Sequence, residues 1–315
     1  MNLESTEDDV TDQATTPTPG VYTGVPMSEY HKWDAASNSR LSRLLKSPAH
    51  LKAAMDEEYT ETPAQRQGRV SHTAILEPDE FESRYVVIGQ CDGKTKSGKR
   101  CSRSGAVYRE GQSFCGQHDP KPGVAHEGPE VISESERDVA LAQRDKVFSR
   151  AAAKTLLTGS GEVELGVLWH DQETDVLCKG RWDRHSPDIA GGAIVDLKTT
   201  KDASRLEFER SIFNFGYFRQ AGLYLSGAQV RRLPAKRFVI IAVEKTPPYE
   251  VAVYRLSDSA TEEGLKQSRL LLRRYAECAE SGEYPGYPDR VVDVFLPPWA
   301  FGKIDEQSKL IEEAA

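Results

Sequence analysis

The sequence contains no long apolar run. No stretch of apolar residues approaches the roughly 18 residues that a membrane-spanning helix requires, so we expect no membrane segment. Residues 1–20 also lack the basic start and the apolar stretch of a signal peptide. They are acidic and rich in Thr and Pro, a composition that predicts a disordered tail over 1–20. These absences together favour a cytoplasmic protein.

Basic residues are fewer than acidic residues in this chain. The chain has 41 Lys and Arg residues against 49 Asp and Glu residues, a net charge of −8. This balance argues against a protein that coats nucleic acid non-specifically, because phosphate contacts require Lys and Arg. Nucleic acid as such is not excluded, since the acidic residues gather at 4–12 and 305–313 while basic residues cluster at 94–103 and 231–237. The length of 315 residues allows a substantial core in one large domain or two.

Cysteine is also scarce, with five residues in the chain. Three of them lie in residues 89–126, a segment rich in Gly, Ser and Lys, poor in aliphatic residues and without helix or strand periodicity of useful length. The pattern C-x9-C-x13-C-x2-H offers Cys91, Cys101, Cys115 and His118 as soft ligands for tetrahedral zinc. So short and polar a segment cannot fold on its own apolar surface, and metal binding would supply the missing stability. We predict an insertion with a structural Zn²⁺ site.

Two other readings of this segment stay open. The thiols could belong to a flexible loop, or they could hold an iron–sulfur cluster. A disulfide is disfavoured in a reducing cytoplasm. The remaining cysteines, Cys178 and Cys278, fall in a predicted strand and a predicted helix, where we expect them to be packing residues.

Hydrophobic periodicity predicts a mixed α/β protein. Helices are expected at 62–76, 133–157, 204–225 and 262–281. Strands are expected at 81–88, 162–169, 176–182, 193–199, 237–243 and 251–255. Ser133 and Glu136 predict a capping box at the start of the second helix. The central order is three strands, a long helix and a fourth strand.

Two carboxylates and a lysine fall on the adjacent strands of this block, in GRWDR (180–184) and IVDLKTT (194–200). Side chains two apart on a strand share a face, so Asp196 and Lys198 point to one spot, which Asp183 can reach from the neighbouring strand. Hard carboxylates suit Mg²⁺ or Mn²⁺. A lysine beside them can orient a water and stabilise charge on a phosphate. The pattern predicts metal-dependent phosphodiester hydrolysis, and its alternative is a surface ion pair.

The spacing D-x12-D-x-K, with GRVSHTAILEPDEF (68–81) and FGYFRQAGLY (215–224), resembles the PD-(D/E)xK nuclease superfamily. Within it the chain is similar to RecB-like nucleases, above all to the RecE (exonuclease VIII) family of phages and prophages. The resemblance implies a nuclease domain over 21–315, interrupted by the insertion, with a mixed central sheet flanked by helices. It implies that His72 and the two aspartates hold Mg²⁺ or Mn²⁺. It also implies active-site roles for Lys198, Gln220 and Tyr224.

The same resemblance implies an activity and partners. The expected enzyme is a Mg²⁺-dependent exonuclease of linear double-stranded DNA, working 5′ to 3′ inside a bacterial host. It would leave 3′ single strands for an annealing recombinase and could assemble as a homo-oligomeric ring. The alternatives are a single-strand or flap endonuclease and, in another class, a catalytically idle DNA- or protein-binding module.

Several of these residues could have a structural role instead of a functional one. His72 on its helix could be a packing or surface residue, and Tyr224 and Tyr217 could belong to a buried stripe. Glu162 or Glu164 could touch a second metal or be solvated. The basic residues of the insertion, which could contact DNA or a partner or be solvated, are Lys94, Lys96, Lys99, Arg100 and Arg103.

Overall fold

The computed structural model describes residues 16–57, 60–126 and 128–313. Residues 1–15 of the predicted tail therefore lie outside the described residues. Gly20 already exchanges backbone hydrogen bonds with Leu168, at 3.0 and 2.9 Å. Ordered chain thus begins before Val21.

The chain divides into two units, Met1–Tyr284 and Pro285–Ala315. The second contains helix α11 (Pro298–Glu313), which buries none of its residues. Among the helices that the structure describes, none has both the length and the apolar character needed to cross a bilayer.

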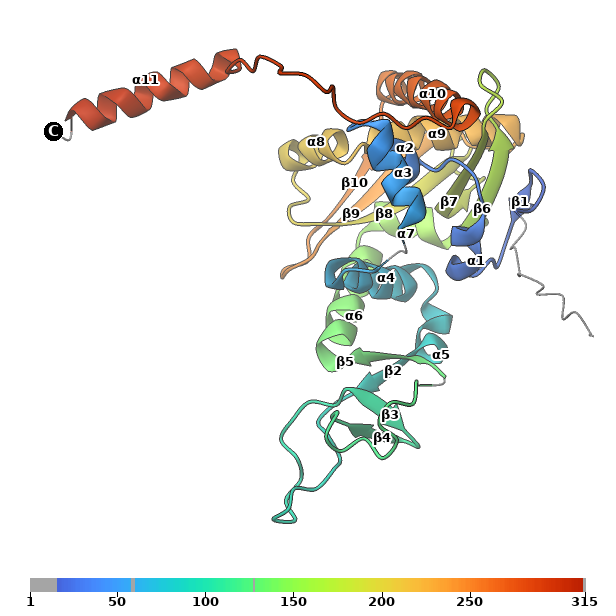
Figure 1. The fold of residues 1–315 in the computed structure, drawn as a ribbon. Coiled ribbons are helices and arrows are strands. Elements are labelled where there is room, and N and C mark those ends of the chain that lie inside the picture. The colour runs from blue at the N-terminus through green and yellow to red at the C-terminus, as the bar shows by residue number, and fades with distance from the viewer. Residues whose placement is uncertain (1–15, 58–59, 127, 314–315) are drawn as a thin grey trace, which may run out of the picture. The chain divides into compact units, whose positions relative to one another are not determined.

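A six-stranded mixed sheet forms the centre of the first unit (Figure 1). Its strands lie in the order β1 (Val21–Tyr22), β6 (Glu162–His170), β7 (Leu177–Ser186), β8 (Ala193–Thr200), β9 (Arg237–Glu244) and β10 (Val251–Arg255). Neighbouring strands are antiparallel except β8 and β9, which are parallel. A parallel pair requires a crossover connection, here helices α8 (Arg205–Asn214) and α9 (Tyr217–Val230). The predicted α/β class and the predicted order of strands and helical segment are confirmed.

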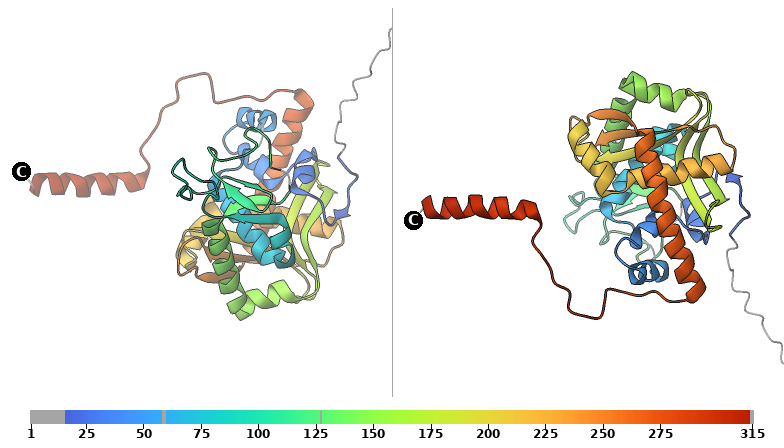
Figure 2. Two further views of the ribbon diagram at one scale, coloured as in Figure 1. Left: turned by 90° about the horizontal axis from the view of Figure 1, so that it is seen from below. Right: turned by 90° about the horizontal axis from the view of Figure 1, so that it is seen from above.

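Helices cover both faces of this sheet (Figures 1 and 2). One face packs on α9, α10 (Asp258–Ser281), α2 (Asn38–Arg43) and α3 (Pro48–Asp56) through Ile194, Phe238 and Ile240. The other packs on α4 (Pro63–Leu76), α6 (Glu134–Ser149) and α7 (Ala151–Thr158) through Val195, Leu197 and Ile241. Burial of both faces explains why β9 reads as a continuous apolar run rather than an alternation.

The predicted helix 204–225 is wrong as a single element, because the chain breaks between α8 and α9. Gly216 has φ +68°, the left-handed region that favours glycine, and a Cβ there would lie 2.0 Å from Arg219 Nη2. The predicted helix 133–157 also divides, into α6 and α7, where Arg150 is extended and its guanidinium pairs with Glu250. The capping box at its start is confirmed.

The predicted strand 81–88 survives only as β2 (Tyr85–Ile88), after a turn η1 (Pro78–Glu80) and helix α5 (Phe81–Arg84). β2 pairs in parallel with β5 (Glu130–Ser133), and the insertion leaves and returns through these two strands. Inside it lies a small hairpin that the sequence did not predict, β3 (Val107–Arg109) and β4 (Gln112–Phe114). Figure 1 shows it beyond β2 and β5, on the side of α4 and α6 away from the large sheet. A short helix α1 (Met27–Lys32) precedes α2.

Candidate active site and metal centres

The predicted active-site aspartates lie where β7 and β8 separate. The predicted strand 176–182 ends before Asp183, but β7 runs on to Ser186. The ladder between β7 and β8 covers Ser186 to Arg184 and stops before Asp183. Beyond this point the Asp183 carboxylate takes the place of a backbone acceptor, because the Leu197 N–H donates to Asp183 Oδ2 at 2.7 Å. The carboxylate is thereby fixed at the opening between two strands.

Asp196, Lys198 and Gln220 form one group at this opening. The Lys198 ammonium lies 2.8 Å from Asp196 Oδ2, as expected for residues two apart on β8. Gln220 Nε2 donates to Asp196 Oδ1 at 2.8 Å. This contact arises because Asp196 shares the face of β8 that packs on α9, the helix of Gln220. Gln220 therefore orients the Asp196 carboxylate from α9.

His72, Glu164 and Asp183 form a second group, drawn from α4, β6 and β7. One ligand atom from each lies within 4.8 Å of the others, and His72 Nδ1 is 3.8 Å from Asp183 Oδ2. Glu164 has φ +53° inside β6, between the ladder pairs Val163–Arg184 and Leu165–Trp182. Such a backbone conformation is costly for a residue other than glycine and is typical of functional sites. It places Glu164 beside Asp183.

The helix that carries His72 is held firmly. Thr62 caps α4 with a full capping box to Gln65, and the helix has proline at its first position. Arg66 ties it to β5 and α6 through Glu130 at 2.6 Å and Glu136 at 2.8 Å. Gly68, the start of the G-x3-H motif, faces Thr199, where a Cβ would make an ordinary 3.7 Å contact. A close approach of β8 is therefore not the reason for this glycine.

The charges of the two groups are coupled. Burial and the carboxylates of Asp196 and Glu164 raise the pKa of Asp183 well above its usual value. Burial lowers the pKa of His72, which keeps the imidazole neutral and able to bind a metal near pH 7. Burial also lowers the pKa of Lys198, but Asp196 and Asp183 outweigh it, so the pKa rises and the ammonium stays charged. Mutual repulsion of the carboxylates is what a divalent cation would relieve.

The donor set fits such a cation. Carboxylate oxygens suit Mg²⁺ and Mn²⁺, and an imidazole favours Mn²⁺ over Mg²⁺. Arg181 pairs with Glu164 Oε2, which leaves Oε1 for a metal. His72, Glu164 and Asp183 would hold the ion. Asp196, which the resemblance also implied as a ligand, is not one of these three and instead pairs with Lys198.

Two predicted tyrosines lie at different depths. Tyr224 is in the core, with its ring 6.2 Å from that of Trp182 and 6.3 Å from that of Phe238, so packing alone accounts for its position. Tyr217, at the start of α9, has its ring centroid 5.0 Å from Lys198 Nζ. Glu162 is exposed at the start of β6 and is not part of the group of three ligands.

Replacing Glu164 with glutamine should weaken binding of Mn²⁺ by at least about ten-fold, because loss even of an outer-shell partner of a metal ligand typically costs about 10- to 100-fold. The amide keeps the shape of the side chain but removes the charge that the cation requires. Calorimetric titration of Mn²⁺ into the purified protein measures the effect. Glu162→Gln, two residues earlier and exposed, is the matched control. Equal affinity in both variants would remove Glu164 from the site.

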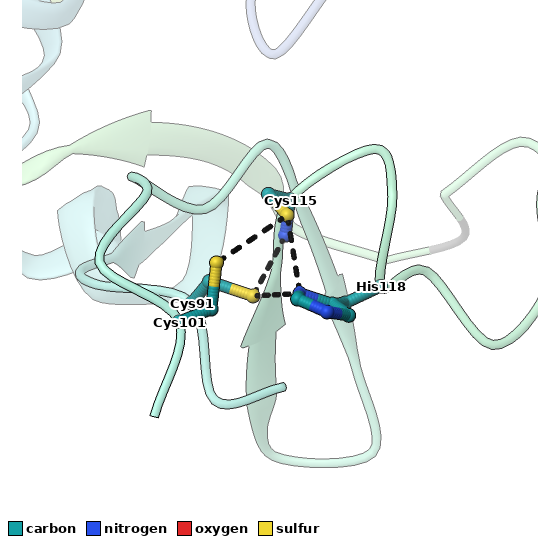
Figure 3. A group of neighbouring side chains, drawn as sticks. All are labelled: Cys91, Cys101, Cys115 and His118. Atoms are coloured by element: carbon teal, nitrogen blue, oxygen red, sulfur yellow. Dashed lines mark hydrogen bonds between the residues drawn. The ribbon is translucent and has the colours of Figure 1, made fainter. Parts of the chain in front are cut away.

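The four predicted zinc ligands come together in the insertion (Figure 3). His118 Nδ1 lies 3.5 Å from Cys91 Sγ and 3.4 Å from Cys115 Sγ, and the sulfurs of Cys101 and Cys115 are 4.0 Å apart. Tetrahedral zinc, with Zn–S of about 2.3 Å and Zn–N of about 2.0 Å, spaces sulfur pairs by about 3.8 Å and sulfur–nitrogen pairs by about 3.5 Å. The cluster therefore has the dimensions of a zinc site.

The thiols of this cluster form no disulfide, and the Cys115 thiol is the one whose pKa is lowered. Burial raises the pKa of the Cys115 thiol, but backbone N–H donors of Gln117 and His118 and the neighbouring thiols bring it down to about 6. A thiolate near neutral pH is the form that binds zinc. By contrast, Cys178 and Cys278 are buried in the core, as predicted.

Gly93 is the residue of the zinc cluster that the sequence did not reveal. A Cβ at this position would lie 2.5 Å from Cβ and Cγ of His118. Gly93→Ala should displace the histidine and lower the affinity for zinc by about ten-fold or more. A chelator competition assay measures the change. Gly116→Ala, where a Cβ meets nothing within 4 Å, should bind zinc normally, and the same loss in both variants would contradict this reading.

The insertion is locally basic. Residues 89–126 hold seven Lys and Arg residues and three Asp and Glu residues, in a chain of net charge −8. Arg100 is engaged by Asp92 at 2.6 Å and by the backbone oxygens of Gln90 and Cys91. It thus stabilises the module, while Lys94, Lys96, Lys99 and Arg103 are exposed.

Comparisons with known proteins bear on the fold and on the family. A crystal structure from Eubacterium rectale, named "Putative exonuclease", superposes with a TM-score of 0.52 at 13% identity, over 94% of this chain and 97% of that chain. At this identity the likeness shows the fold. A second structure, of SSO0001, has a TM-score of 0.25 and 16% identity, over 44% of this chain and 67% of that chain.

No curated protein matches the sequence significantly. A family model does, over residues 37–292, and this range contains every ligand and active-site residue discussed above. The chain therefore belongs to the family described as PDDEXK-like domain of unknown function (DUF3799).

Proposed function

We propose that this protein is a metal-dependent deoxyribonuclease. The observation that carries the proposal is the meeting of His72, Glu164 and Asp183 with the Asp196–Lys198 pair where β7 and β8 separate. Membership of a PDDEXK-like family supports a nuclease. An idle binding module would have no need of a strained Glu164 or of a buried carboxylate paired with a lysine.

Each residue has a distinct task in this proposal. A cation held by His72, Glu164 and Asp183 would polarise the scissile phosphate and its attacking water. Lys198, charged and held 2.8 Å from Asp196 Oδ2, is positioned to stabilise negative charge that develops on the phosphate. Gln220 fixes the orientation of Asp196 from α9. The ring of Tyr217 lies against the ammonium of Lys198 and limits its movement.

The resemblance to RecE-type exonucleases leads us to propose a finer activity. The substrate would be linear double-stranded DNA, degraded 5′ to 3′ to leave a 3′ single strand for an annealing recombinase. A ring-shaped homo-oligomer would provide processivity. In the insertion, Cys91, Cys101, Cys115 and His118 would hold a structural Zn²⁺, and its exposed lysines would contact DNA.

Linear and covalently closed circular duplexes, incubated with Mg²⁺ and with EDTA, test the proposal. In Mg²⁺ each strand of the linear DNA should be degraded from its 5′ end, so that a 5′ label is released before a 3′ label, and the circles should survive. Equal cutting of both would favour an endonuclease. No hydrolysis in Mg²⁺ or Mn²⁺ would refute the nuclease.

A further inference from the structure

Two phenylalanines at the junction of α8 and α9 are exposed without a structural reason. Phe213 is 73% exposed and Phe215 is 65% exposed. Among the described residues of Met1–Tyr284, no other large hydrophobic residue that is exposed is aromatic. A phenyl ring left in water contributes nothing to the core, and such rings commonly mark a binding surface.

Phe215 is connected to the active site through the ring of Tyr217. The ring of Phe215 stacks on that of Tyr217, with centroids 5.7 Å apart and an interplanar angle of 29°. The Tyr217 centroid is in turn 5.0 Å from Lys198 Nζ. The ring of Tyr217 thus connects Phe215 to the ammonium that we place at the phosphate.

The junction holds the rings in place. Gly216, in its left-handed conformation, turns the chain between the helices, with the Arg219 side chain packed beneath it. Phe213 stacks on Phe218 with an interplanar angle of 5° and a centroid separation of 6.2 Å. Both exposed rings therefore rest on partly buried aromatic rings.

We propose that Phe213 and Phe215 form a stacking platform for unpaired bases of the strand that enters the metal centre. The proposal rests on the proposed nuclease function and adds a specificity to it. Aromatic rings stack on every nucleobase, so the platform would be indifferent to sequence. It would favour an unpaired strand over a duplex, because only unstacked bases present a free face. At a duplex end it would hold the separated strand open.

Binding of a single-stranded oligonucleotide tests the platform without relying on cleavage. The Asp196→Asn protein, which we expect not to hydrolyse DNA, would be titrated with an oligonucleotide carrying 2-aminopurine, whose fluorescence falls on stacking. Phe215→Ala in this background should weaken binding about ten-fold, since stacking of one base is worth about 1–3 kcal/mol, and should abolish the quenching. Phe215→Trp should restore both. Leu206→Ala, which removes an equally exposed apolar side chain from α8, should change neither.

A matched abasic oligonucleotide identifies the contact. It should bind the parent protein about ten-fold more weakly than the base-bearing strand, and Phe215→Ala should weaken it no further, because coupled contacts are not additive. Equal losses on both strands, or none on either, would overturn the platform. These outcomes are separate from the proposed function, which fails if the wild-type protein cleaves no DNA.

Discussion

Replacing Asp196 with asparagine should reduce DNA hydrolysis by at least about 10³-fold, since loss of a principal catalytic group typically costs several kcal/mol of transition-state stabilisation. The Asp196 side chain is 2% exposed and pairs with Lys198 and Gln220. An amide in its place is neutral, so it would neither attract a cation nor hold the ammonium at the phosphate. Initial rates on end-labelled linear duplex, at saturating Mg²⁺, measure the loss.

The control for this variant is Asp145→Asn. Asp145 lies on α6, is 70% exposed and pairs with its neighbour Arg144. A surface pair of this kind contributes little to stability, so the control should hydrolyse DNA at the wild-type rate. Circular dichroism should show the folded state in both variants. Wild-type activity in a folded Asp196→Asn protein would refute the assignment of the active site.

Replacing Cys115 with serine should take the bound zinc from one equivalent to none. Cys115 is central to the cluster, within 3.4 Å of His118 Nδ1 and 4.0 Å of Cys101 Sγ, and a hydroxyl is a poor replacement for a thiolate. Because the module has little apolar surface of its own, residues 89–126 should then unfold locally. Elemental analysis gives the zinc content, and hydrogen exchange reports where protection is lost.

The large sheet should keep its protection in this variant, since its core consists of separate apolar clusters on both faces. Cys278→Ala is the control, because Cys278 is buried on α10 outside the cluster and its removal should leave the zinc in place. Purified wild-type protein without zinc would contradict the site, as would a Cys115→Ser variant that retains it.

The alternation of residues along strands and the spacing of the cysteines predicted much of both sites. The two-residue period of β8 is enough to place Asp196 and Lys198 together, and the cysteine spacing is enough to group the zinc ligands. Asp183 was placed near them, but the ladder that stops at Arg184 could not be read from residues. His72 was predicted through the resemblance, since a lone histidine on a helix indicates nothing by itself.

Other features depend on tertiary structure and left little signal. Glu164 occupies an ordinary position in an alternating strand, and the sequence offered it only as one of two glutamates that could touch a metal. Its position between the Val163–Arg184 and Leu165–Trp182 pairs brings it beside Asp183. Gly93 leaves room for the side chain of His118, and no local sequence pattern predicts this contact across 25 residues. The break at Gly216 did have a signal, a glycine between aromatic residues, but helical periodicity on both sides concealed it.

Anomalous diffraction from crystals grown with Mn²⁺ tests the central claim most directly. We expect a manganese peak bounded by His72, Glu164 and Asp183, with ligand distances of about 2.0–2.3 Å. Asp196→Asn crystals should show a weaker peak or none. A manganese peak elsewhere in the wild-type crystals, with none between these three residues, would contradict the account.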